Sequence, residues 1–368
     1  MFNLADSDQK GLTRENGLTL TTREFNPDML ILARESRGKT QAELANALGV
    51  TQSRVSRLED GFLDLTLDLY APLEKALDYP IHFYFQRAAI QGPAPTFYRR
   101  NLTLSKTVLR QTVARMNIMR IQIEKLLAAS DMIEVMLPRL EPDEVKGGVI
   151  NIAQQVRQLW RIPNGPIRNL TAIAEKAGVL VIHFDYGTRR IAGCSDWIGG
   201  LPVVFLNMHL SPARMRYTLA HEIGHLVMHS LPYDNAEEQA HMFAAEFLMP
   251  SADIKSMLLP VNLDRLARLK LHWRVSMQAL LKRSEDLRLI SERTARRWWT
   301  IMSKAGYREV EPHENDIPRE SPILLRELVD MHLQDLGYTS DQLAFDLAVR
   351  EEEFIANYNF QPLLRVVR

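Results

Sequence analysis

The sequence has little of several features that mark particular classes of protein. Its 368 residues include a single cysteine, Cys194, which excludes a disulfide framework and fits a reducing compartment. No apolar run reaches the length of a membrane-spanning helix, and residues 1–8 are polar and acidic, unlike a secretory signal. We therefore expect a soluble, cytoplasmic protein that makes no membrane contact.

The chain also lacks an excess of charge of either sign. Lysine and arginine together number 45, as do aspartate and glutamate, so the formal net charge is zero. A general basic field is therefore excluded, and any contact with nucleic acid must use a local patch. The length is enough for two or three domains.

The most informative segment is Leu-Ala-His-Glu-Ile-Gly-His-Leu-Val-Met-His, residues 219–229. It contains an HExxH pattern, in which His221 and His225 share one helical face and can bind a single Zn²⁺. Glu222 then lies beside the metal, where it can take a proton from the attacking water and pass it to the leaving amine. His229 continues the same face one turn further, and we interpret it as a capping or core histidine.

A catalytic zinc needs a third protein ligand and an open fourth position. Residues 237–250 predict a second helix with an apolar stripe, ended by a proline. We interpret Glu237, at its start, as the third ligand, and His241, four residues later, as a polar neighbour that orients a ligand histidine. The alternatives for the third ligand are Glu238 and Glu246. Glu246 also suits a supporting position or a solvated edge.

At these residues the sequence resembles the ImmA/IrrE family of metallopeptidases. The resemblance is carried by residues 219–229 and by Glu-x-Gln-Ala-His-x-Phe-Ala-Ala-Glu-Phe-Leu-Met-Pro at 237–250, and it covers about 150–300. Ala-Gly-Cys-Ser-Asp-Trp at 192–197 and Val-Val-Phe-Leu-Asn at 203–207 also look like this family. The resemblance implies a small gluzincin-like zinc fold and cleavage of DNA-bound repressors. The family often has Asn or Asp where this chain has His241.

The first domain, residues 25–87, predicts three short helices, at 29–37, 41–48 and 51–59. Thr40 begins the second helix, with Glu43 at the third helical position as in a capping box. Gly49 ends this helix and the third follows after a short turn. Two helices joined by a glycine turn, with apolar residues on their facing sides, are typical of a helix-turn-helix.

This domain resembles the XRE-type, phage repressor/Cro class of helix-turn-helix. The matching words are Thr-Gln-Ala-Glu-Leu-Ala at 40–45 and Gly-Val-Thr-Gln-Ser-Arg-Val-Ser-Arg-Leu-Glu-Asp-Gly at 49–61. The resemblance implies binding of a double-stranded operator, by a homodimer if the site is a palindrome. The residues expected to face DNA are Gln41, Gln52, Ser53, Arg54 and Arg57. The domain is slightly acidic, which leaves open a helix-turn-helix that contacts protein.

The remaining regions predict a linker, a peptidase domain and a helical tail. Residues 88–142 combine a Pro-containing linker, 88–104, with a long helix, 105–136, that could dimerise, face DNA or pack on the peptidase domain. The peptidase domain, 143–305, predicts helices at 151–161 and 167–178 and strands at 179–184, 190–198 and 202–206. A loop at 306–322 precedes a helical C-terminal segment, 323–360. The edge of the short sheet could accept an extended peptide as an added strand.

The sequence thus predicts an α+β, mostly helical protein. It would have an N-terminal helix-turn-helix bundle, a central zincin-like domain with a short sheet and the HExxH helix, and a helical C-terminal region. We expect a DNA-binding transcriptional regulator with a zinc-dependent endopeptidase domain that cleaves a repressor, either a partner or itself. The alternative is a transcription factor whose peptidase-like domain senses a ligand or partner with little or no proteolysis. A third interpretation is an antitoxin-like binding module.

Overall fold

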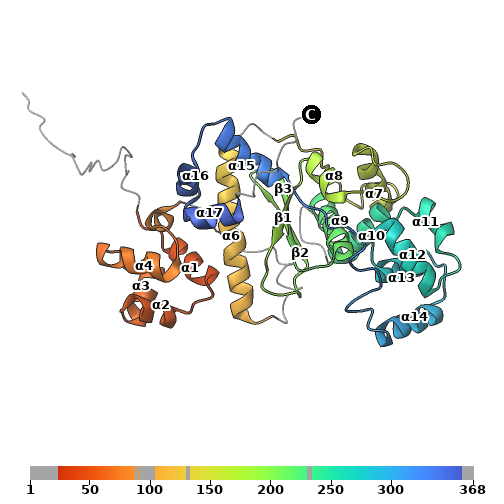
Figure 1. Ribbon diagram of the computed structural model, residues 1–368, viewed down its shortest axis with the longest axis horizontal. Helices are drawn as coiled ribbons and strands as arrows, with labels where there is room; N and C mark the ends of the chain where they lie inside the picture. The colour runs from red at the N-terminus through yellow and green to blue at the C-terminus, as the bar shows by residue number, and fades with distance from the viewer. Residues whose placement is uncertain (1–23, 88–89, 91–103, 130–132, 230–233, 359–368) are drawn as a thin grey trace, which may run out of the picture. The chain divides into compact units, whose positions relative to one another are not determined.

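The computed structural model describes residues 24–87, 90, 104–129, 133–229 and 234–358. The chain forms two compact units (Figure 1). Of the described residues, the first unit contains those up to 90 together with 106–121 and 344–354, and the second contains chiefly those in 122–343. Most of the predicted linker, 88–104, lies outside the described residues.

The first unit contains the predicted helix-turn-helix. A capping box joins Thr40 and Glu43 at the start of α2, and Gly49 ends this helix with a left-handed φ of 68°. Val55 and Leu58 of α3 are buried in the core of the unit. The helices are α1 (Pro27–Ser36), α2 (Gln41–Leu48), α3 (Gln52–Glu59) and α4 (Tyr70–Leu77), with short 3-10 helices at Leu67–Leu69 and Ile81–Phe85.

Two distant stretches complete this unit. The long helix α6 (Lys106–Ala128) contributes Ala114, Ile118 and Ile121 to the same core, and Ala348 joins it from near the end of the chain. The C-terminal stretch is further held by an ion pair between Arg37 Nη2 and Glu353 Oε2 at 3.2 Å. The last helices of the chain are α16 (Ser340–Leu347) and α17 (Glu351–Asn357). The prediction that the long helix extends to residue 136 was wrong.

The second unit is built around a three-stranded sheet of β1 (Leu180–Phe184), β2 (Gly193–Ile198) and β3 (Leu201–Asn207). The order is β1-β3-β2, with β1 parallel and β2 antiparallel to β3. Gly199 and Gly200 connect β2 and β3 with φ of 57° and 87°, a conformation suited to a two-residue hairpin. The three predicted strands are confirmed, although β2 begins three residues later than expected.

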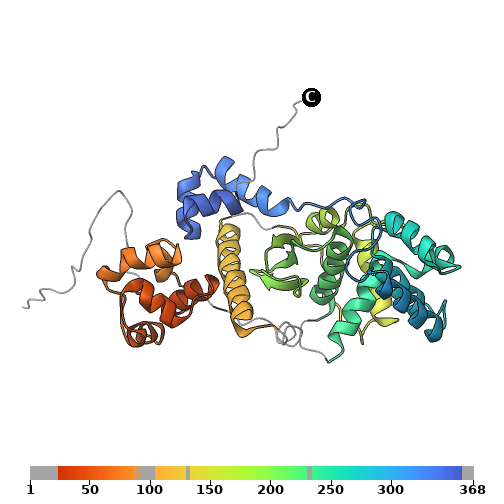
Figure 2. The same ribbon diagram turned by 60° about the horizontal axis from the view of Figure 1, so that its bottom comes forward.

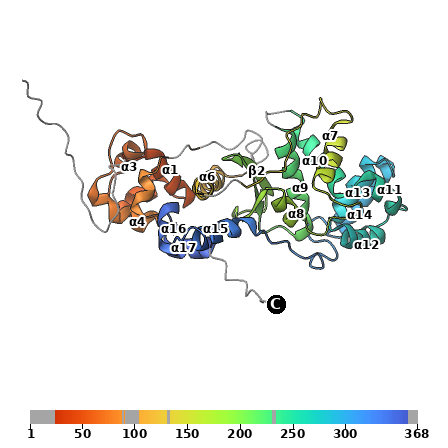
Figure 3. The ribbon, with the colours of Figure 1, turned by 90° about the horizontal axis from the view of Figure 1, so that it is seen from above.

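Helices cover this sheet and extend away from it. The helix α9 (Pro212–Met228) packs against β2, β3 and α10 (Ala236–Leu248), and it lies between the sheet and α10 when viewed from above (Figure 3). The helix α7 (Gly148–Leu159) packs on the other side of α10. The remaining helices are α8 (Leu170–Lys176), α11 (Ser251–Leu258), α12 (Leu263–Trp273), α13 (Met277–Asp286), α14 (Glu292–Lys304) and α15 (Leu324–Gln334) (Figure 2).

Buried charges fix the irregular segment between α14 and α15. The ammonium of Lys270, fully buried in α12, donates to Glu311 at 3.0 Å and to Glu314 at 2.8 Å. Further along, Glu320 pairs with the buried guanidinium of Arg216 at the start of α9. The predicted loop is therefore folded onto the peptidase domain by ion pairs. None of the helices within the described residues is long and apolar enough to cross a membrane.

Candidate metal centre

The HExxH residues lie on the buried helix α9, which faces α10. His221 and Glu222 are each 2% exposed. Gly224 lies between the two histidines, and a Cβ there would lie only 3.0 Å from Cδ1 and 3.2 Å from Cβ of Phe243 on α10. The absence of a side chain at this position therefore lets the two helices approach closely. This approach brings the beginning of α10 beside the histidines.

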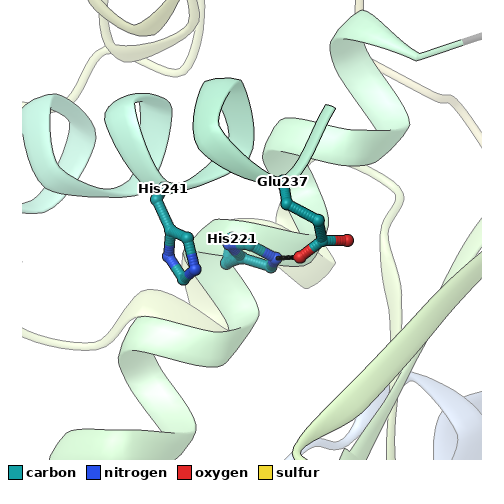
Figure 4. A group of neighbouring side chains, drawn as sticks. All are labelled: His221, Glu237 and His241. Carbon is teal, nitrogen blue, oxygen red and sulfur yellow. Dashed lines mark ion pairs between the residues drawn. The ribbon is translucent and has the colours of Figure 1, made fainter. Parts of the chain in front are cut away.

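The donor groups of three side chains from the two helices lie close together. His221 Nε2 lies 3.1 Å from His225 Nε2. Glu237 Oε2 lies 3.5 Å from His221 Nε2, and Glu237 Oε1 lies 3.4 Å from His225 Nε2. Zinc held tetrahedrally at about 2.0–2.2 Å separates its ligand atoms by about 3.3–3.6 Å. The observed separations of 3.1, 3.4 and 3.5 Å are close to this range, so the three side chains fit a single ion. The arrangement of His221 and Glu237 is shown in Figure 4.

His241 belongs to the same cluster. Its ring centroid lies 4.4 Å from that of His221, and with His221 and Glu237 it forms a group whose ligand atoms lie within 4.8 Å of one another (Figure 4). The hydroxyl of Tyr217, one turn before His221, lies 3.5 Å from His241 Nδ1. Burial raises the pKa of Tyr217 to about 12, so its hydroxyl stays protonated. The role of His241 in orienting a ligand stays a prediction.

The carboxylate of Glu222 is held from the sheet side. Ser195 on β2 donates from Oγ to Glu222 Oε2 at 2.8 Å. The strand comes this close because Gly193 has no side chain. A Cβ there would lie 2.7 Å from Thr218 Cγ2 and 3.0 Å from the carbonyl oxygen of Phe205. The packing of β2 on α9 thus sets the position of the expected general base.

A hydrogen-bonded chain supports one of the histidines. His229 Nδ1 lies 2.9 Å from His225 Nδ1, and His229 Nε2 lies 2.9 Å from Oε1 of Gln239 on α10. Burial lowers the pKa of His229 and favours its neutral ring. The backbone N–H of His229 caps the end of α9, in line with the capping interpretation. Its side chain also contacts His225, which the interpretation as a capping or core histidine did not include. The sequence signal was there, since His229 follows His225 at the same spacing of four.

The two alternatives for the third ligand lie elsewhere. Glu246 is 1% exposed and forms an ion pair with Arg283. It also accepts hydrogen bonds from Gln154 at 3.0 Å and from the backbone of Ser251 at 3.2 Å. It therefore joins α7, α10, α11 and α13, and the interpretation of Glu246 as a solvated edge was wrong. Glu238 lines a cleft beside the proposed zinc ligands.

This cleft has a volume of about 1300 Å³ and is formed largely by α9, α10 and α13. Tyr217, Thr218 and His241 line its side nearest the cluster. Exposed arginines line other parts of it, namely Arg214, Arg288 and Arg308. The cleft beside the proposed zinc ligands is therefore wide and partly cationic.

In the first unit, the residues expected to face DNA differ in how they are held. Gln52, Ser53 and Arg57 are exposed on α3, opposite its buried side. Arg54 donates to Thr66 at 3.1 Å and lies 3.4 Å from Asp68. These contacts hold Arg54 against its own domain.

Gln41 is held by a buried ion pair that sequence reasoning missed. Its amide donates to Glu59 Oε2 at 2.8 Å, and Glu59 also binds Arg34 at 2.5 Å. Arg34 on α1 and Glu59 at the end of α3 lie 25 positions apart, so no local sequence pattern marks them as partners. The pair ties the beginning of α2 to α1 and α3.

The fold and these residues define a class of protein, a DNA-binding regulator with a peptidase-like domain. Two family models match the chain: the helix-turn-helix at residues 30–84 and the IrrE N-terminal-like domain of the M78 peptidases at residues 174–285. The chain is thus a fusion of an XRE-type helix-turn-helix with an ImmA/IrrE-family domain, which confirms both resemblances. A search of curated proteins found none that matches this chain.

Proposed function

We propose that the protein is a zinc-dependent endopeptidase that cleaves a repressor, either a partner or itself, and thereby controls genes whose operators it binds. The observation that carries the proposal is the convergence of His221, His225 and Glu237 beside the carboxylate of Glu222. A zinc site with a purely structural role does not need that carboxylate. Two nitrogen donors and one oxygen donor are also typical of catalytic zinc, which keeps a fourth position open.

The chemistry assigns a role to each side chain. Zinc, when bound, polarises the scissile carbonyl and makes the attacking water more acidic. Glu222 accepts the proton of that water and delivers it to the leaving amine, while the hydrogen bond from Ser195 keeps its carboxylate in place. Tyr217 and His241 lie beside His221 and can donate hydrogen bonds to the oxygen that gains negative charge.

The sheet favours a peptide as substrate. Within the described part of the chain β2 is an edge strand, and it carries Ser195 next to Glu222. An extended segment that adds to β2 as a further strand would pass the general base and continue towards the cleft. The exposed arginines of the cleft suit an acidic stretch of such a substrate.

The decisive experiment incubates the full chain, loaded with zinc, with candidate repressors and with a second preparation of itself. Glu222→Gln should keep zinc and fold but lose proteolysis by about 10²–10⁴-fold, the usual contribution of a positioned general base. Glu144→Gln, which neutralises an exposed carboxylate that does not line the cleft, is the matched control and should cleave like wild type. Equal cleavage by wild type and Glu222→Gln would refute the peptidase proposal.

The second candidate function is a sensor with little proteolysis. Its supporting observation is the cleft of about 1300 Å³, which is large enough to hold a small ligand beside the proposed zinc ligands. Absence of cleavage across a repressor panel, combined with a ligand that changes operator affinity, would favour this function. For either function we propose that a homodimer binds a palindromic operator, with half-sites about 34–36 Å apart.

A further inference from the structure

A second cleft, of about 400 Å³, lies in the first unit beside the helix-turn-helix. Gln41 and Gln52, two of the residues expected to face DNA, line it, as do Lys39 and Arg110. Arg110 is not part of the helix-turn-helix but of the first half of α6. The cleft therefore joins the predicted DNA-facing surface to an element from a later part of the chain.

The position of Arg110 is fixed by packing. The amide of Gln111, the next residue, donates to the backbone carbonyl of Ser36 at 3.2 Å. A Cβ at Gly38 would lie 3.3 Å from the side chain of Gln111, so α6 approaches the turn between α1 and α2 closely. Ala114 and Ile118, on the same helix, are buried in the core of the first unit. Arg110 is thus presented by an anchored helix.

The charge of the cleft is positive. Neither Lys39 nor Arg110 forms an ion pair with another described residue, and Arg110 is exposed. Three cationic residues line the cleft, Arg34, Lys39 and Arg110, against one acidic residue, Glu35. Glu35 lies 3.8 Å from Arg34, which also pairs with the buried Glu59. The chain as a whole has no net charge, so an anion would be attracted by a local excess of cations such as this one.

We propose that this cleft binds a phosphate of the operator backbone, with Arg110 and Lys39 as the cationic donors. A helix-turn-helix places its second helix in the major groove and its first across the backbone. The phosphates beside the groove then lie near the start of α2, where the cleft opens next to Gln41. Contacts of this kind position the protein without reading sequence. The proposal rests on DNA binding by the helix-turn-helix and is independent of peptidase activity.

The test uses the full chain and a duplex selected by the wild-type protein from a random library. Fluorescence anisotropy at several KCl concentrations gives the slope of log affinity against log salt concentration. Arg110→Ala should make this slope shallower by about 0.9, the amount for one lost phosphate contact, without changing the preferred sequence. Arg110→Lys should retain most of the slope. Lys75→Ala, which removes an exposed cation of α4 outside the cleft, is the matched control and should behave like wild type.

Two results would overturn the proposal in distinguishable ways. If the wild type binds the selected duplex and Arg110→Ala has the same slope as Lys75→Ala, the cleft takes no phosphate, although DNA binding stands. If the wild type selects no duplex at all, the phosphate site and the DNA-binding half of the proposed function fail together. An unchanged melting temperature for Arg110→Ala shows that its effect does not come from unfolding.

Discussion

The hydrogen-bonded chain behind His225 allows a sharp prediction about metal affinity. If His225 binds zinc through Nε2, as we propose, its proton must lie on Nδ1, which would then donate to His229 Nδ1 at 2.9 Å. His229 then carries its own proton on Nε2 and donates to Gln239 Oε1 at 2.9 Å. Burial lowers the pKa of His229 and so favours the neutral ring, which is the form that this arrangement requires.

The size of the effect follows from this geometry. Loss of a group that orients a metal-binding histidine typically weakens metal affinity by about 10–100-fold. This loss of affinity corresponds to about 1.4–2.8 kcal/mol of zinc-binding free energy. We expect His229→Ala to weaken zinc affinity by an amount in this range. Gln239→Leu should weaken zinc affinity less, because His229 remains in contact with His225. Gln239→Glu keeps an acceptor oxygen and should remain close to wild type.

The assay is a competitive titration of the apo protein with zinc against a chelating indicator. His221→Ala removes a proposed ligand and shows how far zinc affinity falls when a ligand is lost. Glu238→Gln serves as a control substitution nearby, outside the chain of hydrogen bonds. Circular dichroism checks that each variant is folded. If His229→Ala binds zinc as tightly as wild type while His221→Ala does not, the reasoning about proton positions is wrong.

Three further predictions concern other parts of the molecule. Gly193→Ala should lower the free energy of unfolding by about 1–3 kcal/mol and reduce proteolysis, because the new methyl group would push β2 away from Thr218; wild-type values in urea unfolding and in the cleavage assay would contradict this. Burial raises the pKa of Glu175 to about 7, so the folded chain holds a proton that the unfolded chain releases. Stability should therefore fall as pH rises from the ordinary carboxyl range to about 7, and Glu175→Gln should flatten that fall in denaturation curves at several pH values. Gln52→Ala should relax base preference at one operator position, costing about 1–3 kcal/mol if the lost contact is bidentate, and an unchanged preference in a binding-site selection would argue that α3 contacts protein.

Features set by local signals could be predicted from the sequence. The capping box of Thr40 and the left-handed Gly49 define α2, and the two strands beside Gly199 and Gly200 are separated by a recognisable turn. The spacing of His221 and His225 fixes their common face without any tertiary information. Each of these depends on residues within a few positions of one another.

Features that depend on contacts between distant elements could not be predicted. The end of α6 is an example, since an amphipathic pattern continues past Ala128 but the backbone N–H of Met136 instead donates to Ala177 at 2.9 Å. Gln239 is another, because its role exists only when α10 packs on α9. The requirement for glycine at position 193 likewise follows from how closely β2 approaches α9.

The make-up of the first unit has a consequence for the gene. Residues 344–354 are encoded after the peptidase domain, yet Ala348 completes the core around the helix-turn-helix and Glu353 binds Arg37. A premature stop codon that removes only this end would leave the DNA-binding unit with an exposed apolar surface. We therefore expect truncated products to be poor competitors for the operator. Truncations that remove the peptidase-like domain would therefore also weaken DNA binding by the first unit.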